Sequence, residues 1–434
     1  MKKAQVFSLE QNESVRNRLT HSLEVADIGK TIAREVGRQL VAKKIATQEE
    51  ALCLETIVEN ACLIHDIGNP PFGHFGEEAI KKWFTDNVNC LLSENKDFKE
   101  KNTKRLLKKR KDQFNCLYNF DGNPQGFRIV TKLHTEIDRY GLNLTYSTLL
   151  ASIKYPIWSD SSEYKKIGIF TNEAEIYNEI CKKTKHNSGK RYFAVYLMEL
   201  ADDICYCLSD IADAFEKGII NYEFFKKEME ILFKEDNIDI NDEKYKALIN
   251  IIIRNKDFKN FSHDIAIGVA QDCIASAITL FIKNIESYLN GSEEDVISKI
   301  NSGKVLKCFK KFSKKFIYNN TEVQKLEIAG HRIVWGLLDH YGKLLKISND
   351  EFLHFVNNNQ MKNGLDFEWR VYNRISKRMI DAYKYELQDL KSKNNFELID
   401  EWLLRCRLII DYISGMTDQS ALRYYQNVMG ISLD

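Results

Sequence analysis

The chain has 434 residues, of which 44% are hydrophobic, 29% charged and 11% aromatic. This composition excludes an intrinsically disordered protein, because the apolar side chains suffice to bury a large core. The 63 lysine and arginine residues nearly balance the 62 acidic residues. The resulting formal net charge of +1 excludes a globally basic nucleic-acid-binding protein and a protein with an acidic disordered tail.

Proline is rare and confined to the first part of the chain. The four prolines are Pro70, Pro71, Pro124 and Pro156. A long stretch without proline permits helices, and the segments 193–215 and 398–412 place apolar residues three and four positions apart, as helices do. We therefore predict an all-α protein, with long connections near residues 85–130 and at most a short strand near residues 167–170.

The N-terminus and the cysteines bear on localisation. The first residues lack an apolar segment long enough for a signal peptide, and no run of about 18 apolar residues predicts a membrane span. The ten cysteines are scattered without the paired spacing of metal ligands, which indicates buried thiols in a reducing compartment. We expect a cytoplasmic protein that does not bind membranes.

The first candidate metal ligand is His21. Positions 21, 25, 28 and 32 of a helix share one face, and this face contains His21, Val25, Ile28 and Ile32. A histidine on an apolar face is either a hydrogen-bonded core residue or a ligand, and this segment alone leaves both interpretations open.

The second candidate is the pair His65-Asp66, which follows a run of apolar residues. A Gly-Asn-Pro-Pro segment then ends the helix, and His74 and Glu77 follow, three residues apart, so that both can face one pocket. A buried imidazole and carboxylate are costly unless their desolvation is offset, and a divalent cation offsets it. The alternative is a buried His–Asp hydrogen bond beside a structural turn.

The third candidate is Asp202, which together with Asp203 interrupts an otherwise apolar helical segment. Adjacent side chains on a helix point about 100° apart, so at most one of these carboxylates faces the interior. Tyr206 lies four residues beyond Asp202 and shares its face. A solvent-facing side of the helix suits Asp203, Asp210 and Asp213 better than Asp202.

Together, these candidates supply two imidazoles and two carboxylates without a thiolate. Such a mixed nitrogen and oxygen set favours Mn²⁺, Mg²⁺, Co²⁺ or Fe²⁺ over a structural Zn²⁺ site, with Zn²⁺ as an alternative. Four protein ligands on an octahedral ion leave two positions for water and a substrate oxygen, as metal-assisted catalysis requires.

The order of a histidine, a His-Asp pair and an aspartate resembles the HD superfamily of metal-dependent phosphohydrolases. Wider sequence blocks resemble its deoxyguanosinetriphosphate triphosphohydrolase (dGTPase) branch, whereas residues 85–115 and 220–400 resemble this branch only loosely. The matching blocks are AQVF at 4–7, RNRLTHSLEVADIGK at 16–30, HDIGNPPFGHFGEEAI at 65–80, NFDGNPQGFRI at 119–129, GLNLTYSTLLASIKYP at 141–156, MELADDICY at 198–206 and DYISGMTDQSAL at 411–422.

The resemblance implies the HD-domain helical phosphohydrolase fold and the hydrolysis of a dNTP, such as dGTP, to the deoxynucleoside and tripolyphosphate. It also implies that His74 is the catalytic histidine near the α-phosphate and the 5′ oxygen, with Glu77 holding it in position. Whether His74 acts as acid, base or nucleophile stays open. The implied metal ligands are His21, His65, Asp66 and Asp202.

Substrate contacts are also implied by the resemblance, although each of these residues is equally compatible with a capping or packing role. In the segment KKIGIF, the implied phosphate-contacting lysine is Lys165, and its neighbour Lys166 is the alternative. The implied contacts are Arg18 and Lys165 to phosphate, Tyr206 to the sugar, Gln5 and Val6 near the base and sugar, and Asn123 and Gln125 in a pocket turn.

The same resemblance implies a domain organisation and an assembly. We expect an HD-type catalytic core over residues 1–215, with an insertion at about 85–118. We expect a helical C-terminal region over 216–434 that packs on the core and completes the pocket and the oligomer contacts. Relatives form homo-oligomers, so a hexamer or another even-numbered assembly is expected.

A basic run over residues 99–111 contains eight lysines and arginines. It is either a solvated insertion or a contact for single-stranded DNA or a regulatory nucleotide, because clustered cations bind phosphate groups. The chain also begins with only MKKA ahead of the QVF block, where the family has several basic residues.

Two other functions remain as alternatives. One is an HD phosphohydrolase that acts on a nucleoside monophosphate or a cyclic nucleotide. The other is a helical nucleic-acid-binding protein with a structural metal site, in which His74 and Glu77 would have no function.

Overall fold

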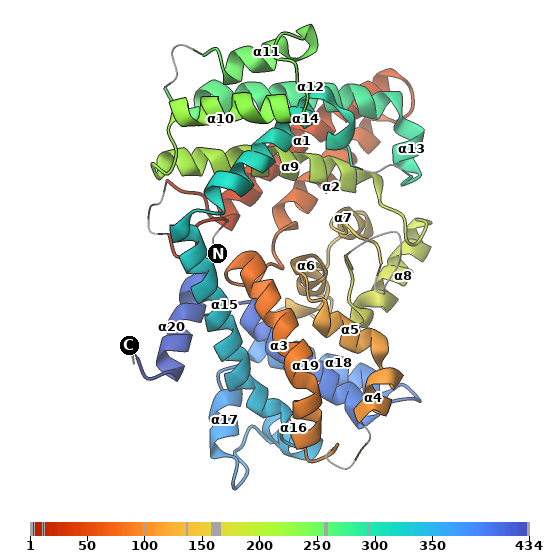
Figure 1. Ribbon diagram of the computed structural model, residues 1–434. Coiled ribbons are helices and arrows are strands. Elements are labelled where there is room, and N and C mark those ends of the chain that lie inside the picture. Colours follow the sequence, from red (N-terminus) through yellow and green to blue (C-terminus); the bar gives the residue numbers. More distant parts are fainter. Residues whose placement is uncertain are drawn as a thin grey trace. The chain divides into compact units, whose positions relative to one another are not determined.

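The computed structural model describes residues 3, 5–10, 12, 14–98, 101, 103–135, 138–157, 166–255, 259–292 and 295–431. In this part of the chain every regular element is a helix, which confirms the prediction of an all-α fold (Figure 1). The chain divides into two compact units. Unit 1 comprises Met1–His65, Tyr146–Lys154 and Cys181–Leu326, and unit 2 comprises Asp66–Thr145, Tyr155–Ile180 and Glu327–Asp434. The expected domain division after residue 215 stays a prediction.

Unit 1 is built from long helices and a few short ones. Two further helices, α8 and α15, have residues in both units. The helices of unit 1 are α1 (Arg18–Ala42), α2 (Gln48–Ile64), α7 (Tyr146–Ala151), α9 (Phe193–Glu216), α10 (Tyr222–Glu235), α11 (Glu243–Ile252), α12 (Ile267–Lys283), α13 (Ile285–Leu289) and α14 (Asn301–Phe312).

Unit 2 contains more short helices. They are α3 (Gly73–Glu94), α4 (Thr103–Lys109), α5 (Lys111–Tyr118), α6 (Gly122–Arg128), α16 (Asn349–Asn358), α17 (Asp366–Tyr372), α18 (Lys377–Lys391), α19 (Leu398–Ser414) and α20 (Asp418–Val428). The two shared helices are α8 (Ala174–Thr184) and α15 (Thr321–Tyr341). Single turns of π-helix cover Ile129–Leu133, Ser262–Ala266 and Ser313–Ile317, and 3₁₀ turns cover Thr171–Glu173, Ile297–Lys299 and Gly342–Leu345.

One local prediction was wrong. The described residues of 85–130 form the end of α3 and the helices α4, α5 and α6 rather than long connections, because α5 buries Phe114 and Leu117 and Asp121 caps α6. The described residues of 167–170 form no strand. Gly168 and Ile169 both donate backbone hydrogen bonds to the one carbonyl oxygen of Ile157, and such a shared acceptor is not the ladder of a strand.

The helices α1 and α2 pack closely because small residues line their contact. Asn17 begins α1 with a reciprocal capping box that it forms with Thr20. A Cβ atom at Gly29 would lie 2.5 Å from the Cys62 sulfur, and one at Gly37 would lie 2.9 Å from the Ala51 Cβ. The absence of side chains at these glycines therefore lets α1 approach α2, and this approach sets the spacing of their histidines.

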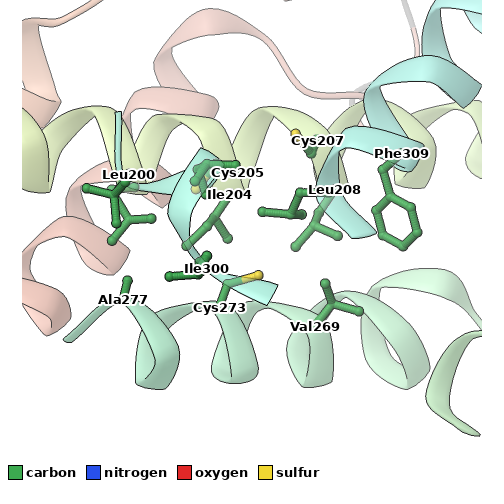
Figure 2. Close-up of a cluster of buried hydrophobic side chains, with 14 of the residues drawn as sticks. Leu200, Ile204, Cys205, Cys207, Leu208, Val269, Cys273, Ala277, Ile300 and Phe309 are labelled. Atoms are coloured by element: carbon green, nitrogen blue, oxygen red, sulfur yellow. The ribbon is translucent and has the colours of Figure 1, made fainter. Parts of the chain in front are cut away.

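The core of unit 1 forms around α9, which is buried on nearly every side. In Figure 2, Ile204 and Leu208 of α9 lie opposite Cys273 and Val269 of α12, and Phe309 of α14 closes the cluster. A helix that is apolar all round belongs in an interior. Any charged residue on α9 that faces inward therefore needs a specific partner.

One segment, Ser262–Lys283, is long and apolar enough to cross a membrane by length and composition alone. It joins a π-helical turn to α12, whose residues Val269, Cys273 and Ala277 point into the cluster with α9 (Figure 2). One face of α12 is therefore packed in the core of unit 1, and length and composition alone are weak evidence for a membrane span.

A buried ionic network organises unit 2. Arg128, 1% exposed, donates hydrogen bonds to Asp411 at 2.8 Å, to Glu386 at 2.7 Å and to Glu173 at 2.8 Å. Lys132 lies 3.0 Å from Glu386. Burial alone would lower the pKa of Arg128, but the three carboxylates hold it well above its usual range. The network thus ties α6 to α18 and α19.

Loss of the Arg128 guanidinium leaves these carboxylates buried without their main partner. We expect Arg128→Met to lower the free energy of unfolding by about 3–5 kcal/mol, because removing one member of a buried ion pair strands the other charges. Urea denaturation followed by circular dichroism measures this change. Arg38→Met is the control, since Arg38 is 70% exposed and bonded to Glu35 on the same helix. Equal stability of the two variants would contradict the role of the network.

Candidate active site

Two buried histidines meet where α1 and α2 pack together. His21 lies on the buried face of α1, and His65 caps the C-terminus of α2. Their ring centroids are 5.5 Å apart. His21 is 0% exposed and His65 is 7% exposed, so neither imidazole has bulk water as its main partner.

Asp202 of α9 completes this cluster within unit 1. Its Oδ1 atom lies 3.3 Å from Nε2 of His21 and 3.3 Å from Nε2 of His65. The adjacent Asp203 points elsewhere, toward Lys310, whose Nζ lies 2.6 Å away. The structure therefore brings three of the four predicted metal ligands together in unit 1 and separates the two adjacent carboxylates.

The hydrogen bonding of His65 shows that the cluster fits a cation. Its Nδ1 lies 2.7 Å from the carbonyl oxygen of Cys62, which can only accept, so Nδ1 carries a hydrogen. A neutral His65 then directs the lone pair of Nε2 toward a carboxylate oxygen of Asp202. Two lone pairs repel each other unless a positive charge lies between them, which is either a proton on Nε2, so that a cationic His65 donates to Asp202, or a metal ion. A divalent metal ion would supply that charge.

Asp66 is the fourth predicted ligand and is bonded directly to His65. One ligand atom from each of His21, His65 and Asp66 lies within 4.8 Å of the other two. The boundary between the two units falls at the peptide bond between residues 65 and 66. The side chain of Asp66 also accepts a hydrogen bond of 2.7 Å from the Asn69 amide.

Lys154 is a site residue that the sequence analysis missed. Its Nζ lies 2.6 Å from Oδ2 of Asp202, on the side of the carboxylate away from the histidines. Burial alone would raise the pKa of Asp202, but Lys154 and then His65 hold it well below its usual range. The sequence carries no clear signal for Lys154, because a lysine just beyond the end of a helix such as α7 is ordinarily exposed.

His74 and Glu77 form a pair at the start of α3 in unit 2. Nδ1 of His74 lies 2.9 Å from Oε2 of Glu77, while the His74 side chain is 81% exposed and that of Glu77 only 5%. The other oxygen of Glu77 accepts a hydrogen bond of 2.8 Å from the backbone N–H of Gly122. Glu77 is thus fixed at both oxygens, and it directs Nε2 of His74 away from itself.

Four predicted substrate contacts lie in unit 1. Arg18 is the first residue of α1 and half-buried, and Val6 packs on the hydrophobic core. Gln5 is half-buried, with an Oε1 atom that has no hydrogen-bond partner in the described part of the chain. The hydroxyl oxygen of Tyr206 lies 2.8 Å from that of Tyr318.

Three predicted contacts belong to unit 2, and two of them can be described. The predicted pocket turn is the first turn of α6, where Asn123 bonds to Asp121 through its backbone and side-chain nitrogens. Gln125 is fully buried, and its side-chain amide donates a hydrogen bond of 2.9 Å to Asp411. Lys165 lies outside the described residues. Its neighbour Lys166 lies 3.2 Å from Asp121.

Two carboxylates expected on a solvent-facing side of α9 are buried instead. Asp210 and Asp213 are each 1% exposed, because Tyr318 donates to Asp210 and Arg16 bonds to Asp213 at 2.7 Å. Burial raises the pKa of Asp210 to about 7. Asp210 and Tyr206 share the hydroxyl of Tyr318, so this protonatable carboxylate belongs to the surroundings of a predicted sugar contact.

Comparisons with known protein families match two regions of the chain. Residues 18–144 match the HD domain family, and residues 370–427 match the phosphohydrolase-associated domain family. A deoxyguanosinetriphosphate triphosphohydrolase of Yersinia enterocolitica is 34% identical over 98% of this chain and 90% of its own length. Proteins of the same name from Cronobacter sakazakii and Salmonella typhimurium are each 32% identical over 99% of this chain and 90% of their own lengths.

The adjacent aspartates allow a matched test of the cation site. We expect Asp202→Asn to weaken Mn²⁺ binding by more than about 100-fold, because loss of a ligand should exceed the 10–100-fold effect of removing an outer partner. Asp203→Asn changes the same atoms one residue away, where the partner is Lys310, and should leave Mn²⁺ affinity unchanged. Isothermal titration calorimetry distinguishes the two, and equal affinities would refute the assignment.

Asp210 predicts a pH dependence of stability. Its pKa in the folded protein, about 7, exceeds the ordinary value near 4, so its contribution to stability is present below about pH 4 and is lost as the pH rises through 7. The charged neighbours Asp213, Arg16 and Asp202 are common to the wild type and to Asp210→Asn. As the pH rises from 5 to 8, the melting temperature of the wild type should therefore fall relative to that of Asp210→Asn. A constant difference would contradict the raised pKa.

Proposed function

The chain belongs to the deoxyguanosinetriphosphate triphosphohydrolase family, and on this premise we propose that it hydrolyses dGTP, and other dNTPs, to the deoxynucleoside and tripolyphosphate. The observation that carries the proposal is the buried cluster of His21, His65 and Asp202. It combines the residue types that such a reaction needs with a geometry that fits a cation.

Dependence on a divalent metal ion is general for HD domains. The residues that would hold the ion are His21, His65, Asp66 and Asp202. When bound, such an ion polarises a phosphate oxygen and activates water for attack. The two positive charges of the ion would balance the two carboxylates. The charge of Lys154 would then give the pocket a net positive charge, which suits a triphosphate. We propose Mn²⁺, Mg²⁺ or Co²⁺, with Fe²⁺ and Zn²⁺ as alternatives.

His74 would protonate the 5′ oxygen of the leaving deoxynucleoside. The carboxylate of Glu77 accepts the Nδ1 hydrogen and favours the protonated imidazole, so that Nε2 can hold the proton to be transferred. The backbone N–H of Gly122 keeps Glu77 in place. Such a positioned general acid contributes about 10²–10⁴-fold to a rate.

The substrate contacts would divide by chemistry. Cationic side chains would bind the triphosphate, an aromatic ring would pack on the sugar, and amides would bind the base or sugar. These contacts are Arg18, Lys154 and Lys165 or Lys166 to phosphate, Tyr206 to the sugar, Gln5 and Val6 near the base and sugar, and Asn123 and Gln125 as pocket residues.

Localisation and assembly are also part of the proposal. All ten cysteines are free thiols, which supports a cytoplasmic protein. An even-numbered homo-oligomer is proposed from the resemblance, and the exposed Ile328 of α15 is an apolar residue that such an assembly could cover. In the basic run, Lys109 bonds to Glu397 and Arg110 to Asp400, so part of its charge is already neutralised and contact with single-stranded DNA or a regulatory nucleotide is the less favoured role.

An assay of products tests the function. With Mn²⁺ and each dNTP, we expect equal amounts of deoxynucleoside and tripolyphosphate, and His74→Ala should lower kcat by about 10²–10⁴-fold through loss of the general acid. His263→Ala is a matched control, since His263 is 76% exposed and lies 3.0 Å from Asp264. Release of orthophosphate from monophosphates, or of a linear nucleotide from a cyclic one, would instead favour the other HD phosphohydrolase activity.

A further inference from the structure

The backbone of Phe72 has a conformation that is unfavourable for an L-residue. Its φ of 62° and ψ of 19° lie in the left-handed region, and no side chain caps the helix that starts at the next residue. Left-handed residues other than glycine and asparagine persist only where their surroundings enforce them, and they concentrate at functional sites. Phe72 stands two residues before His74.

A buried carboxylate enforces this conformation. The backbone N–H of Phe72 donates a hydrogen bond of 2.9 Å to Oδ1 of Asp418. Phe72 is 5% exposed and Asp418 is 3% exposed, so water cannot easily replace the bond. A buried backbone N–H that loses its acceptor is costly, so the conformation of Phe72 is coupled to this one oxygen atom.

The ring of Phe72 is held by a second element of unit 2. A Cβ atom at Gly330 of α15 would lie 2.4 Å from Cγ of Phe72, so α15 can pack on the ring only because residue 330 has no side chain. The ring and the backbone of Phe72 are thus fixed by α15 and α20.

Asp418 is itself rigidly placed. It is the first residue of α20, directly after the N-cap Thr417, which forms a reciprocal capping box with Ser420. A carboxylate at a helix N-terminus is stabilised by the helix dipole. Because Thr417 caps α20, Oδ1 of Asp418 can accept a hydrogen bond from a residue outside this helix.

We infer that Asp418 is a positioning residue for the reaction. By holding Phe72 in its left-handed conformation, Asp418 sets where α3 begins and therefore where His74 and Glu77 lie. The inference rests on the proposed function of His74. It also gives a role to the matched phosphohydrolase-associated region, 370–427, which would hold the catalytic turn of the HD-matching region through this hydrogen bond.

Kinetics of Asp418 variants form the first test. We expect Asp418→Ala to lower kcat for dGTP by about 10–100-fold with KM within about 2-fold, because a displacement of about 1 Å at a reacting group can cost 10²-fold. Asp418→Asn keeps an oxygen acceptor and should restore most of the rate. Asp350→Ala is the matched control, since Asp350 is an exposed aspartate in the first turn of α16. Equal rates for Asp418→Ala and the wild type would overturn the inference.

A double-mutant cycle separates positioning from stability. Glycine adopts a positive φ without strain, so in a Phe72→Gly background the added Asp418→Ala change should cost kcat less than about 3-fold. Where Phe72→Gly does not fold, Phe72→Asn serves, because asparagine tolerates the left-handed region. Additive losses in kcat would show that Asp418 does not act through the conformation of residue 72.

A readout that needs no activity distinguishes failure of this inference from failure of the proposed function. The imidazole resonance of His74, assigned by its loss in His74→Gln, should change its chemical shift and its titration in Asp418→Ala but not in Asp350→Ala. An unchanged His74 resonance would overturn the inference even if the enzyme hydrolyses dGTP. A changed resonance in a protein that does not hydrolyse dNTPs would support the positioning role and refute the proposed function.

Discussion

The carboxylate of Asp202 is the constraint around which unit 1 is organised. It lies on α9, a helix that is buried on nearly every side, and the partial burial of its charge requires close partners. His21 and His65 approach one oxygen, and Lys154 approaches the other. Each partner comes from a different part of the chain, so α1, the end of α2 and the residues after α7 must converge on one point of α9. The packing of unit 1 and the geometry of the proposed cation site therefore depend on the same contacts.

In unit 2, buried carboxylates are neutralised mainly by an arginine rather than by histidines and a lysine. Arg128 and Lys132 neutralise buried carboxylates, and Arg407, which is also buried, stacks on the Phe170 ring at 3.7 Å. Asp411 receives both Arg128 and the amide of Gln125, so the network also fixes α6, whose first N–H binds Glu77. The stability of unit 2 and the position of the proposed catalytic pair, His74 and Glu77, therefore depend on the same buried charges.

Sequence reasoning identifies polar residues that interrupt an apolar helical pattern. It does not identify their interaction partners when these lie far away in the sequence. The helical fold followed from periodicity, and His21 and Asp202 were visible because each is a polar residue in an apolar helix. Lys154 was not, since a lysine near a helix end is ordinarily exposed and only its partner shows otherwise. Asp210 was assigned to solvent because its cover, Tyr318, lies more than a hundred residues away. The roles proposed for the substrate contacts rest on resemblance and stay predictions.

The interleaving of the two units along the chain has a consequence for biosynthesis. The chain leaves one unit for the other after residues 65, 145, 154, 180 and 326. A ribosome-bound chain that has emerged through residue 144 contains the whole HD-matching region but neither Lys154 nor Asp202, and the apolar face of α1 has not yet met α9. Unit 1 is complete only after residue 326, and unit 2 only at the end of the chain. The nascent protein thus exposes apolar helix faces for most of its synthesis, which is the state that chaperones bind.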